Sequence, residues 1–310
     1  MQISLPSPYL LFLGDTTNPL DAKTAIGLRD WRPELCIGQL RLSQCTVDLG
    51  LPDLSPAEAI SQGARSLLIG VAPLGGRIAP SWVNTLQDSL NSGLNIVSGL
   101  HESLTSIPSL ANIAKNSRRN LIDVRKPPER LEVASGACRS GNRLLTVGTD
   151  CCVGKKYTAL AMARELSENG INVTFRATGQ TGIIIAGSGI PIDAVVSDFI
   201  SAAAELLTPD ADQQHWDVIE GQGSLFHPAY AAVTLGLLHG SQPDALPLCH
   251  RAGREHIDEF ESFRIPELPE CILRYEEAAS LTNPFSRVIG VSLNTSGLED
   301  SEARRLCDEV

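Results

Sequence analysis

Short hydrophobic runs alternate with amphipathic stretches along the first 130 residues. Five runs have the composition of buried strands: Tyr9–Leu13, Leu35–Gly38, Ser66–Val71, Asn95–Ser98 and Leu121–Val124. Helical spacing of hydrophobic residues separates them, at Asp21–Arg29, Pro56–Gly63, Pro80–Leu90 and Ile107–Lys115. Because the strands do not alternate with period two, both faces of their sheet should be covered. The pattern predicts a parallel sheet between helices, a Rossmann-like domain over residues 1–130.

A second alternating block begins at Leu144. Its expected strands are Leu144–Val147, Asn172–Arg176, Asp217–Ile219, Leu246–Cys249 and Val288–Leu293. Helical patterns cover Lys155–Glu168, Asp193–Leu206, Tyr230–Leu238 and the segment from Glu299 onward. Prolines at 127 and 128 break the pattern and indicate a linker. We therefore expect two three-layer α/β domains with mainly parallel sheets, the second over residues 131–310. Since the last helical pattern reaches Val310 without a cap, we expect the recorded chain to be truncated.

The second block opens with LLTVGTDCCVGKKYT, residues 144–158. A strand, a glycine-bounded loop, a lysine and a helix follow one another in the order of a phosphate-binding loop. In such loops the backbone N–H groups and the helix N-terminus bind an anion beside the lysine. The expected cofactor-binding residues are Gly148, Thr149, Asp150, Cys151, Cys152, Val153, Gly154, Lys155, Lys156 and Thr158. The pattern makes the second domain P-loop NTPase-like.

Two details of this loop depart from the common nucleotide-binding pattern. Five residues separate Gly148 from Gly154, where four are usual, and Lys156 replaces the Ser or Thr whose hydroxyl contacts Mg²⁺. Thr158, two residues on, is the nearest hydroxyl. The alternative to a phosphate-binding loop is a strand-to-helix turn in which the glycines have no role in binding.

Polar residues at other strand ends are further candidates. Glu220 follows the strand Trp216–Ile219 and precedes a glycine, which suits a Mg²⁺ ligand or a general base. His227 precedes a helix and is suited to proton transfer. His250 and Arg251 end the fourth strand. Asn294 ends the last one, where its amide suits pairing with a base ring or forming a turn.

Two more candidates lie between the second and third strands of this block. Arg176 and Gln180 flank a glycine-containing turn and suit binding of a carboxylate or phosphate, although a structural turn explains them equally well. Asp198 follows an apolar run, a pattern typical of a buried helix with an inward carboxylate.

The composition excludes several classes of function. A formal net charge of −11 argues against nucleic acid as a partner. No apolar run approaches the roughly 18 residues that span a bilayer, and no secretory signal is present. The eight cysteines show no zinc-type spacing, so we expect reduced thiols in a cytoplasmic protein. For Cys151 and Cys152, the lysines and helix N-terminus nearby favour a nucleophilic thiol. The alternative is that small residues fit a tight loop.

Several of these motifs carry a resemblance to known families. GTDCCVGKK, EGQGS and SLNT resemble the loop, acidic strand and asparagine strand of dethiobiotin synthetase, which binds ATP and activates a carboxylate. A longer resemblance covers nearly the whole chain, in DAKTA, GLH, DVR, ATGQTGI, DAVVSDF, EGQGSLFHPAY, TLGLLHGSQPD and LCH. By these motifs the chain is identified as a member of the D-glutamate N-acetyltransferase family. That resemblance implies a Rossmann-like domain, a P-loop domain and acetyl transfer from acetyl-CoA to D-glutamate.

Three functions follow from these readings. In an acetyltransferase the loop binds the coenzyme A phosphates, Glu220 is the base with His227 or Asp198 as alternates, and arginines receive the substrate carboxylates. In an ATP-dependent kinase or ligase, Glu220 and Thr158 bind Mg²⁺. The third is a nucleotide- or coenzyme A-binding module without turnover. We expect a small-molecule substrate and a homo-oligomer, with no nucleic acid or membrane partner.

Overall fold

The computed structural model describes residues 5–73 and 75–310, which form two compact units. One contains residues 5–126 together with 180–188, and the other contains residues 127–179 together with 189–310. The helix at 180–186 thus groups with the first unit, although it lies in the second half of the sequence.

The first unit is built on a sheet of five parallel strands. Their order is β2-β1-β3-β4-β5, a doubly wound arrangement. The strands are β1 (Tyr9–Gly14), β2 (Cys36–Arg41), β3 (Ser66–Ile69), β4 (Asn95–Ser98) and β5 (Leu121–Asp123). Strands β1, β3 and β4 are buried along their whole length, because both of their faces are covered. The predicted Rossmann-like sheet is confirmed.

Five helices and three short 3₁₀ turns accompany this sheet. The helices are α1 (Lys23–Trp31), α2 (Pro56–Ser61), α3 (Val83–Ser92), α4 (Pro108–Ser117) and α6 (Gln180–Ala186), and the turns are Pro33–Leu35, Pro80–Trp82 and Leu104–Ser106. Helix α2 begins with a capping box in which Ser55 and Glu58 exchange hydrogen bonds. Helix α6 packs on α1, where the hydroxyls of Thr24 and Thr181 lie 3.1 Å apart.

The second unit is built on a sheet ordered β13-β10-β6-β9-β8, all parallel, with β7 pairing with β10. Its strands are β6 (Asn142–Leu145), β7 (Val147–Gly148), β8 (Val173–Arg176), β9 (Trp216–Ile219), β10 (Ala245–Arg251) and β13 (Arg287–Asn294). The chain leaves β6 for β8 at one side and returns to β10 at the other. The carboxyl end of β6 and β7 is therefore a switch point, where ligands of such sheets bind.

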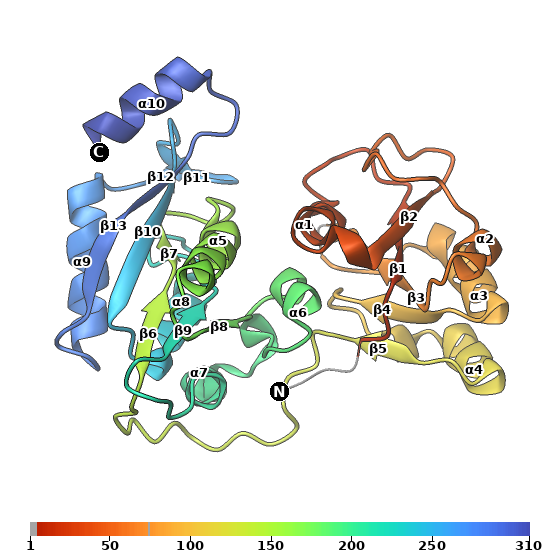
Figure 1. Cartoon of the computed structure of the whole chain (residues 1–310), viewed down its shortest axis with the longest axis horizontal. Helices are drawn as coiled ribbons and strands as arrows, with labels where there is room; N and C mark the ends of the chain where they lie inside the picture. The colour runs from red at the N-terminus through yellow and green to blue at the C-terminus, as the bar shows by residue number, and fades with distance from the viewer. Residues whose placement is uncertain (1–4, 74) are drawn as a thin grey trace. The chain divides into compact units, whose positions relative to one another are not determined.

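Helices cover both faces of this second sheet. They are α5 (Lys155–Glu168), α7 (Ile200–Leu207), α8 (Ala231–Ser241), α9 (Leu268–Ser280) and α10 (Asp300–Glu309). One core contains residues of α7, α8 and α9, and a separate core contains residues of α5. Figure 1 shows α9 and α5 on opposite sides of the sheet. The predicted three-layer domain is thus confirmed.

Parts of this unit differ from the sequence-based prediction. The expected helix Asp193–Leu206 is wrong at its start: two 3₁₀ turns, Ile192–Ala194 and Ser197–Phe199, precede α7, because Val195 and Val196 are extended. The prediction also lacked α9 and a small hairpin of β11 (His256–Ile257) and β12 (Phe260–Arg264).

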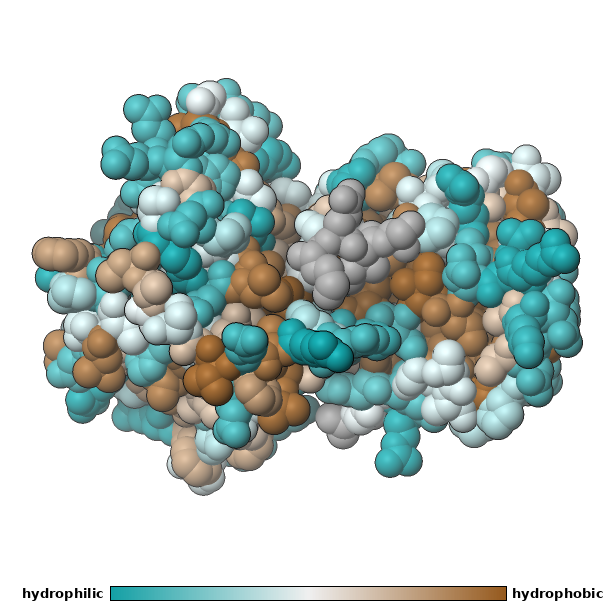
Figure 2. Space-filling view, turned by 90° about the horizontal axis from the view of Figure 1, so that it is seen from below, coloured by the Kyte–Doolittle hydropathy of each residue, from teal (hydrophilic) through white to brown (hydrophobic). Residues whose placement is uncertain are grey.

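On the face drawn in Figure 2, hydrophobic residues are interspersed with hydrophilic ones. Among the described residues, no helix is both long enough and apolar enough to cross a membrane.

Candidate active site

The loop after β7 has the backbone of an anion-binding site. It runs from Gly148 to Gly154, where φ is +115°, and α5 begins at the next residue. Cys152 also has a positive φ, +55°, a conformation that is uncommon for residues other than glycine. Within residues 5–73 and 75–310, the N–H groups of Cys152, Val153 and Gly154 donate to no protein acceptor. These N–H groups and the start of α5 can hold an anion.

Lys155 is folded against its own loop. Its Nζ donates a 2.7 Å hydrogen bond to the backbone oxygen of Asp150, and its side chain is buried. Gly221, after β9, makes room for the lysine stem: a Cβ there would lie 1.7 Å from the backbone oxygen of Thr146 and 3.1 Å from Cδ of Lys155. Only glycine fits between β6 and the lysine at this position.

The Asp150 carboxylate ties the loop to the turn after β10. It is fully buried, and its Oδ1 accepts from the N–H of Cys151 at 2.6 Å. Its Oδ2 accepts from Nη1 of Arg254 at 2.8 Å and from the N–H of Asp258 at 2.9 Å. The sequence reading selected Arg251 on this segment and missed Arg254, because nothing in the pattern shows which arginine turns back to the loop.

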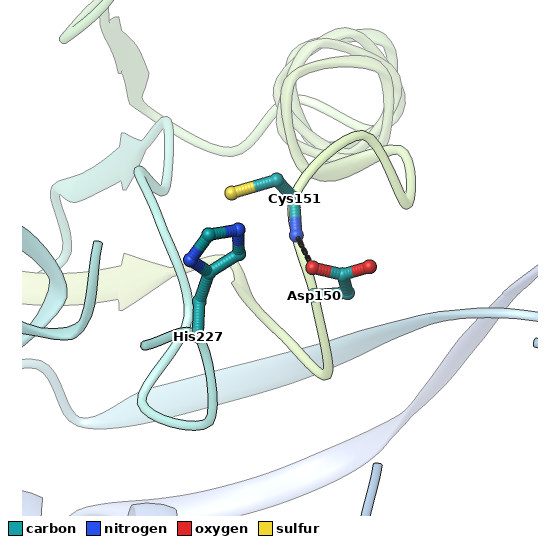
Figure 3. A group of neighbouring side chains, drawn as sticks. All are labelled: Asp150, Cys151 and His227. Carbon is teal, nitrogen blue, oxygen red and sulfur yellow. Dashed lines mark hydrogen bonds between the residues drawn. The ribbon is translucent and has the colours of Figure 1, made fainter. Parts of the chain in front are cut away.

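Cys151 and His227 face each other across the loop (Figure 3). One ligand atom from each of Asp150, Cys151 and His227 lies within 4.8 Å of the others. Nδ1 of His227 accepts from the N–H of Ala229 at 3.1 Å, so the neutral ring carries its proton on Nε2. The ring also packs edge-on against Phe260, with centroids 5.1 Å apart. It is therefore held in one orientation.

Burial sets the protonation state of His227. The side chain is 3% exposed, and this burial lowers its pKa below the ordinary value, with Lys155 acting in the same direction against the opposing charge of Asp150. At neutral pH the imidazole is thus neutral, with Nδ1 accepting from the Ala229 N–H and Nε2–H available as a donor.

Glu220 lies at the carboxyl end of β9, as predicted, but its carboxylate is engaged. Oε2 accepts from the N–H groups of Thr178 at 3.0 Å and Gly179 at 3.1 Å. The hydroxyl of Thr178 donates back to the Glu220 backbone oxygen at 2.6 Å. Burial raises the pKa of Glu220, and the two N–H groups and Lys156 only partly oppose this. The residue fixes the turn that leads out of β8.

The predicted candidates near β10 and β13 also lie beside the loop. His250 Nδ1 is 2.9 Å from the hydroxyl of Thr149, and burial lowers the pKa of His250. Asn294 lies next to Gly154, where a Cβ would be 4.0 Å from the asparagine's own. Its Oδ1 accepts from the N–H of Ser296 at 3.0 Å, so the turn-forming interpretation describes what it does here.

Thr158 does not have the geometry of a metal ligand. Its hydroxyl lies 2.9 Å from that of Ser292 on β13 and accepts from Sγ of Cys249 on β10 at 3.4 Å. This hydroxyl therefore joins α5 to the sheet and is not directed into the loop.

Three other predicted residues lie in unexpected surroundings. Arg176 pairs with the buried carboxylate of Asp217 at 2.6 Å, and Gln180 accepts from Arg125 within the first unit. Asp198 is exposed in a 3₁₀ turn, so the expectation of a buried inward carboxylate is wrong. Arg251, in contrast, is exposed at the end of β10.

Tyr275, which sequence reasoning missed, contacts the loop through its hydroxyl. Its hydroxyl donates to the backbone oxygen of Gly148 at 2.7 Å and accepts from the N–H of Leu225 at 3.2 Å. Complete burial raises the pKa of Tyr275 to about 12. It joins the loop to the segment that carries His227. The only available signal was the spacing of Cys271, Tyr275 and Ala279 on one face of a helix.

A surface hollow of about 490 Å³ in the first unit is a weaker candidate. It is lined by Gln39, Arg41 and Asp53, among others, and the guanidinium of Arg41 is already paired with Asp53. Because the Asp53 carboxylate of this lining is held by Arg41, the loop is the better candidate.

Comparison with known proteins agrees with this architecture. Residues 41–127 match the family described as "Domain of unknown function (DUF1611_N) Rossmann-like domain", and residues 132–310 match "Domain of unknown function (DUF1611_C) P-loop domain". A crystal structure of a DUF1611 family protein from Anabaena variabilis is similar, with a TM-score of 0.88 and 34% identity, covering 98% of this chain and 92% of that one.

Two curated relatives carry a functional name. A protein from a Pseudoalteromonas species is 47% identical over 99% of this chain and 93% of its own length, and one from Tritonibacter scottomollicae is 48% identical over 99% and 92%. Both are named D-glutamate N-acetyltransferase, which supports the prediction of an acetyltransferase enzyme. The chain therefore belongs to the D-glutamate N-acetyltransferase family.

Proposed function

We propose that this protein transfers an acetyl group from acetyl-CoA to the amine of D-glutamate. The observation that carries the proposal is the near full-length similarity to two proteins with that name, both with more than 90% of their own length aligned. The loop after β7 provides the matching chemistry, since the acyl donor carries phosphates.

The loop suits phosphates that are bound but not transferred. Its N–H groups, the N-terminus of α5 and Lys155 supply positive potential. A side chain at position 148 would fill the space beside the lysine, because a Cβ there would lie 3.1 Å from Nζ. Position 156 has no hydroxyl for Mg²⁺, and the hydroxyl of Thr158 is bonded to the sheet. An acyl transfer does not need that metal contact.

The reaction also needs a donor to the oxygen of the thioester carbonyl, where negative charge develops. We assign this role to His227, because its Nε2 faces the loop and carries the proton of the neutral ring, whose pKa is lowered by burial. Glu220 is not assigned as the base that accepts the amine proton, since two backbone N–H groups hold its Oε2. Its proposed role is to position the turn at Thr178 and Gly179.

A carboxylate of the amino acid needs a cation near the same sheet edge. Arg251 is exposed at the end of β10, three residues before Arg254. Arg176 is committed to Asp217. We therefore assign carboxylate binding to Arg251.

One observation favours a second candidate, an ATP-dependent kinase or ligase. Glu220 ends the strand beside the loop strand, where an acid that binds Mg²⁺ would be expected. This reading requires Glu220 to release its two N–H donors and bind a metal.

Free-thiol release from acetyl-CoA tests the proposal. Multiple turnovers with D-glutamate, and few or none with L-glutamate or without an amine, are expected. ADP formation from ATP and Mg²⁺ is measured in parallel with the same preparation. If D-glutamate does not raise the rate of thiol release, the proposed reaction is wrong. ADP formation that depends on a carboxylate substrate would favour the ligase.

A further inference from the structure

Binding of the acyl donor does not by itself explain why the thiol of Cys151 faces the imidazole of His227. Both lie in the second unit, where a half-buried thiol faces a buried imidazole whose Nδ1 is occupied by the N–H of Ala229 (Figure 3). The thiol belongs to the anion-binding loop itself. An acyl group attached to the pantetheine arm of a bound donor would have a nucleophile close by, together with an N–H donor for its carbonyl oxygen.

A metal site is the competing explanation for this group of side chains. Asp150, its third member, already accepts three hydrogen bonds from Cys151, Arg254 and Asp258 through its two oxygens. A metal at this position would have to compete with the buried Arg254 ion pair for the same carboxylate. The hydrogen bonds therefore favour a role for Asp150 in holding the loop, which leaves the thiol and imidazole as a pair.

The backbone distinguishes Cys151 from its neighbour. Cys152 is exposed, and it is not part of the group with His227. Cys151 is half-buried, and its own N–H is bound by the Asp150 carboxylate. Of the two adjacent cysteines, Cys151 is the one that groups with His227.

We propose that Cys151 is a covalent catalyst that carries the acetyl group between acetyl-CoA and the amine. The proposal rests on the function proposed above. It makes the reaction a double displacement, in which coenzyme A leaves before the amine reacts.

The two half-reactions balance. First, Sγ forms a bond to the acetyl carbonyl carbon while Nε2–H of His227 donates to the acetyl oxygen, the bond from that carbon to the coenzyme A sulfur breaks, and the thiol proton goes to that sulfur. Free coenzyme A leaves with the proton. In the second half, the amine nitrogen bonds to the acetyl carbon, Nε2–H of His227 again donates to the acetyl oxygen, and the carbon–Sγ bond breaks as the amine gives up a proton. The proton returns to Sγ, which regenerates the free Cys151 thiol.

The first half-reaction is testable without any amine. The full chain is mixed with acetyl-CoA alone, quenched in acid and measured by intact-protein mass spectrometry, with peptide mapping to locate the label. We expect one acetyl group on Cys151 and one equivalent of coenzyme A released in a burst. Cys138→Ser is the control, since Cys138 is another free thiol and is exposed in the 127–141 segment. It should label like the wild type.

Two variants at position 151 test whether the thiol is needed for turnover. Cys151→Ala and the nearly isosteric Cys151→Ser are compared, and their thermal unfolding shows that they are folded. Both should lose acetyl transfer by at least about 100-fold. Initial rates of the wild type should give parallel double-reciprocal plots. Folded Cys151→Ala with a rate within about threefold of the wild type would overturn the proposal.

The outcomes separate this inference from the function itself. If D-glutamate stimulates thiol release while Cys151 stays unlabelled, the acetyltransferase stands and covalent catalysis is wrong. If Cys151 is labelled while D-glutamate has no effect, covalent catalysis stands and the acceptor is wrong. Stoichiometric Zn²⁺ in the purified wild type that Cys151→Ser lacks would overturn the nucleophile in favour of a metal site. Label on Cys152 would also overturn it.

Discussion

The ammonium group of Lys155 donates a 2.7 Å hydrogen bond to the backbone oxygen of Asp150, five residues earlier in the same loop. The buried lysine therefore lies within the loop that it serves, and Gly221 leaves space for its stem. An anion bound by the loop would meet a positive charge already in place, so little side-chain entropy would be lost on binding.

Lys155→Ala should weaken binding of acetyl-CoA. A hydrogen bond to a charged group contributes about 1.5 to 3 kcal/mol, so the KM for acetyl-CoA should rise roughly 10- to 100-fold. Steady-state rates over a series of acetyl-CoA concentrations give this value. Lys115→Ala, on an exposed position of α4, is the matched control and should leave KM unchanged. An unaltered KM in Lys155→Ala would rule out this lysine as a donor-binding group.

Glu220→Ala should destabilise the second unit. The substitution leaves the buried N–H groups of Thr178 and Gly179 without their acceptor, at a cost of about 1 to 3 kcal/mol each. Glu220→Gln retains a carbonyl oxygen for these donors and should be milder. Urea unfolding of both variants measures the difference. Equal stability of the alanine variant and the wild type would show that the two N–H groups find other partners.

The stability of Glu220→Gln relative to the wild type should depend on pH. Because burial raises the pKa of Glu220, the native state holds its proton more tightly than the unfolded state. The contribution of Glu220 to stability is complete below the unfolded pKa, about 4.3, and is lost as the pH rises through the raised folded pKa. The glutamine variant should therefore gain on the wild type as the pH increases over this range. A difference in unfolding free energy that does not change with pH would contradict the raised pKa.

His227 should give the acid limb of the pH–rate profile. Its pKa is lowered by burial, so the neutral ring, in which Nδ1 accepts from Ala229 and Nε2–H donates, is lost only as the pH falls below the ordinary value of about 6.5. His227→Gln should lower kcat roughly 100- to 1,000-fold and remove this limb. His239→Gln is the control, since the ring of His239 is bonded to the Ala278 backbone oxygen at 3.0 Å. A limb that persists in His227→Gln would assign it to another group.

The sequence predicted the architecture of the second unit well for a physical reason. Continuous apolar runs such as Leu144–Val147 identify buried parallel strands, and the glycines and lysine after them identify the loop. These signals are local. Asp150 and Cys151 were named as members of the loop on the same grounds.

The partners of these loop residues could not be predicted from the sequence. Arg254 lies 104 residues from Asp150 and Tyr275 lies 127 residues from Gly148, so only the folded sheet brings them together. At Asp198 the local sequence pattern itself led to a wrong prediction. Apolar neighbours suggested burial, but the extended Val195 and Val196 end the helical pattern and leave the carboxylate exposed.

Removing the Asp150 carboxylate should destabilise the protein strongly. Arg254 is largely buried, so Asp150→Ala would leave its charge without a partner at a cost of about 3 to 5 kcal/mol. In a double-mutant cycle, adding Arg254→Ala should cost much less than the sum of the single changes. Arg274→Ala, in an exposed pair with Glu270, should change stability little. Additive effects at Asp150 and Arg254 would show that the ion pair contributes nothing.

The two candidate arginines, Arg176 and Arg251, should behave oppositely when replaced by alanine. Arg176→Ala leaves the buried carboxylate of Asp217 with only the ring of His215, 3.1 Å away, so it should lower the melting temperature. Arg251→Ala removes an exposed side chain and should leave the melting temperature unchanged. If Arg251 binds the substrate carboxylate, its loss should raise the KM for D-glutamate roughly 10- to 100-fold.

The KM for acetyl-CoA separates this role of Arg251 from a general effect on the site. Arg251 is outside the loop, so Arg251→Ala should leave the KM for acetyl-CoA unchanged while the KM for D-glutamate rises. Arg251→Lys keeps the charge but loses the two-pronged contact with a carboxylate, so it should give an intermediate value. Thermal unfolding and steady-state rates, measured on the same preparations, distinguish a loss of D-glutamate binding from a loss of stability. If Arg176→Ala alone raises the KM for D-glutamate and keeps its stability, the assignment is reversed, and the pairing with Asp217 must open when the substrate binds.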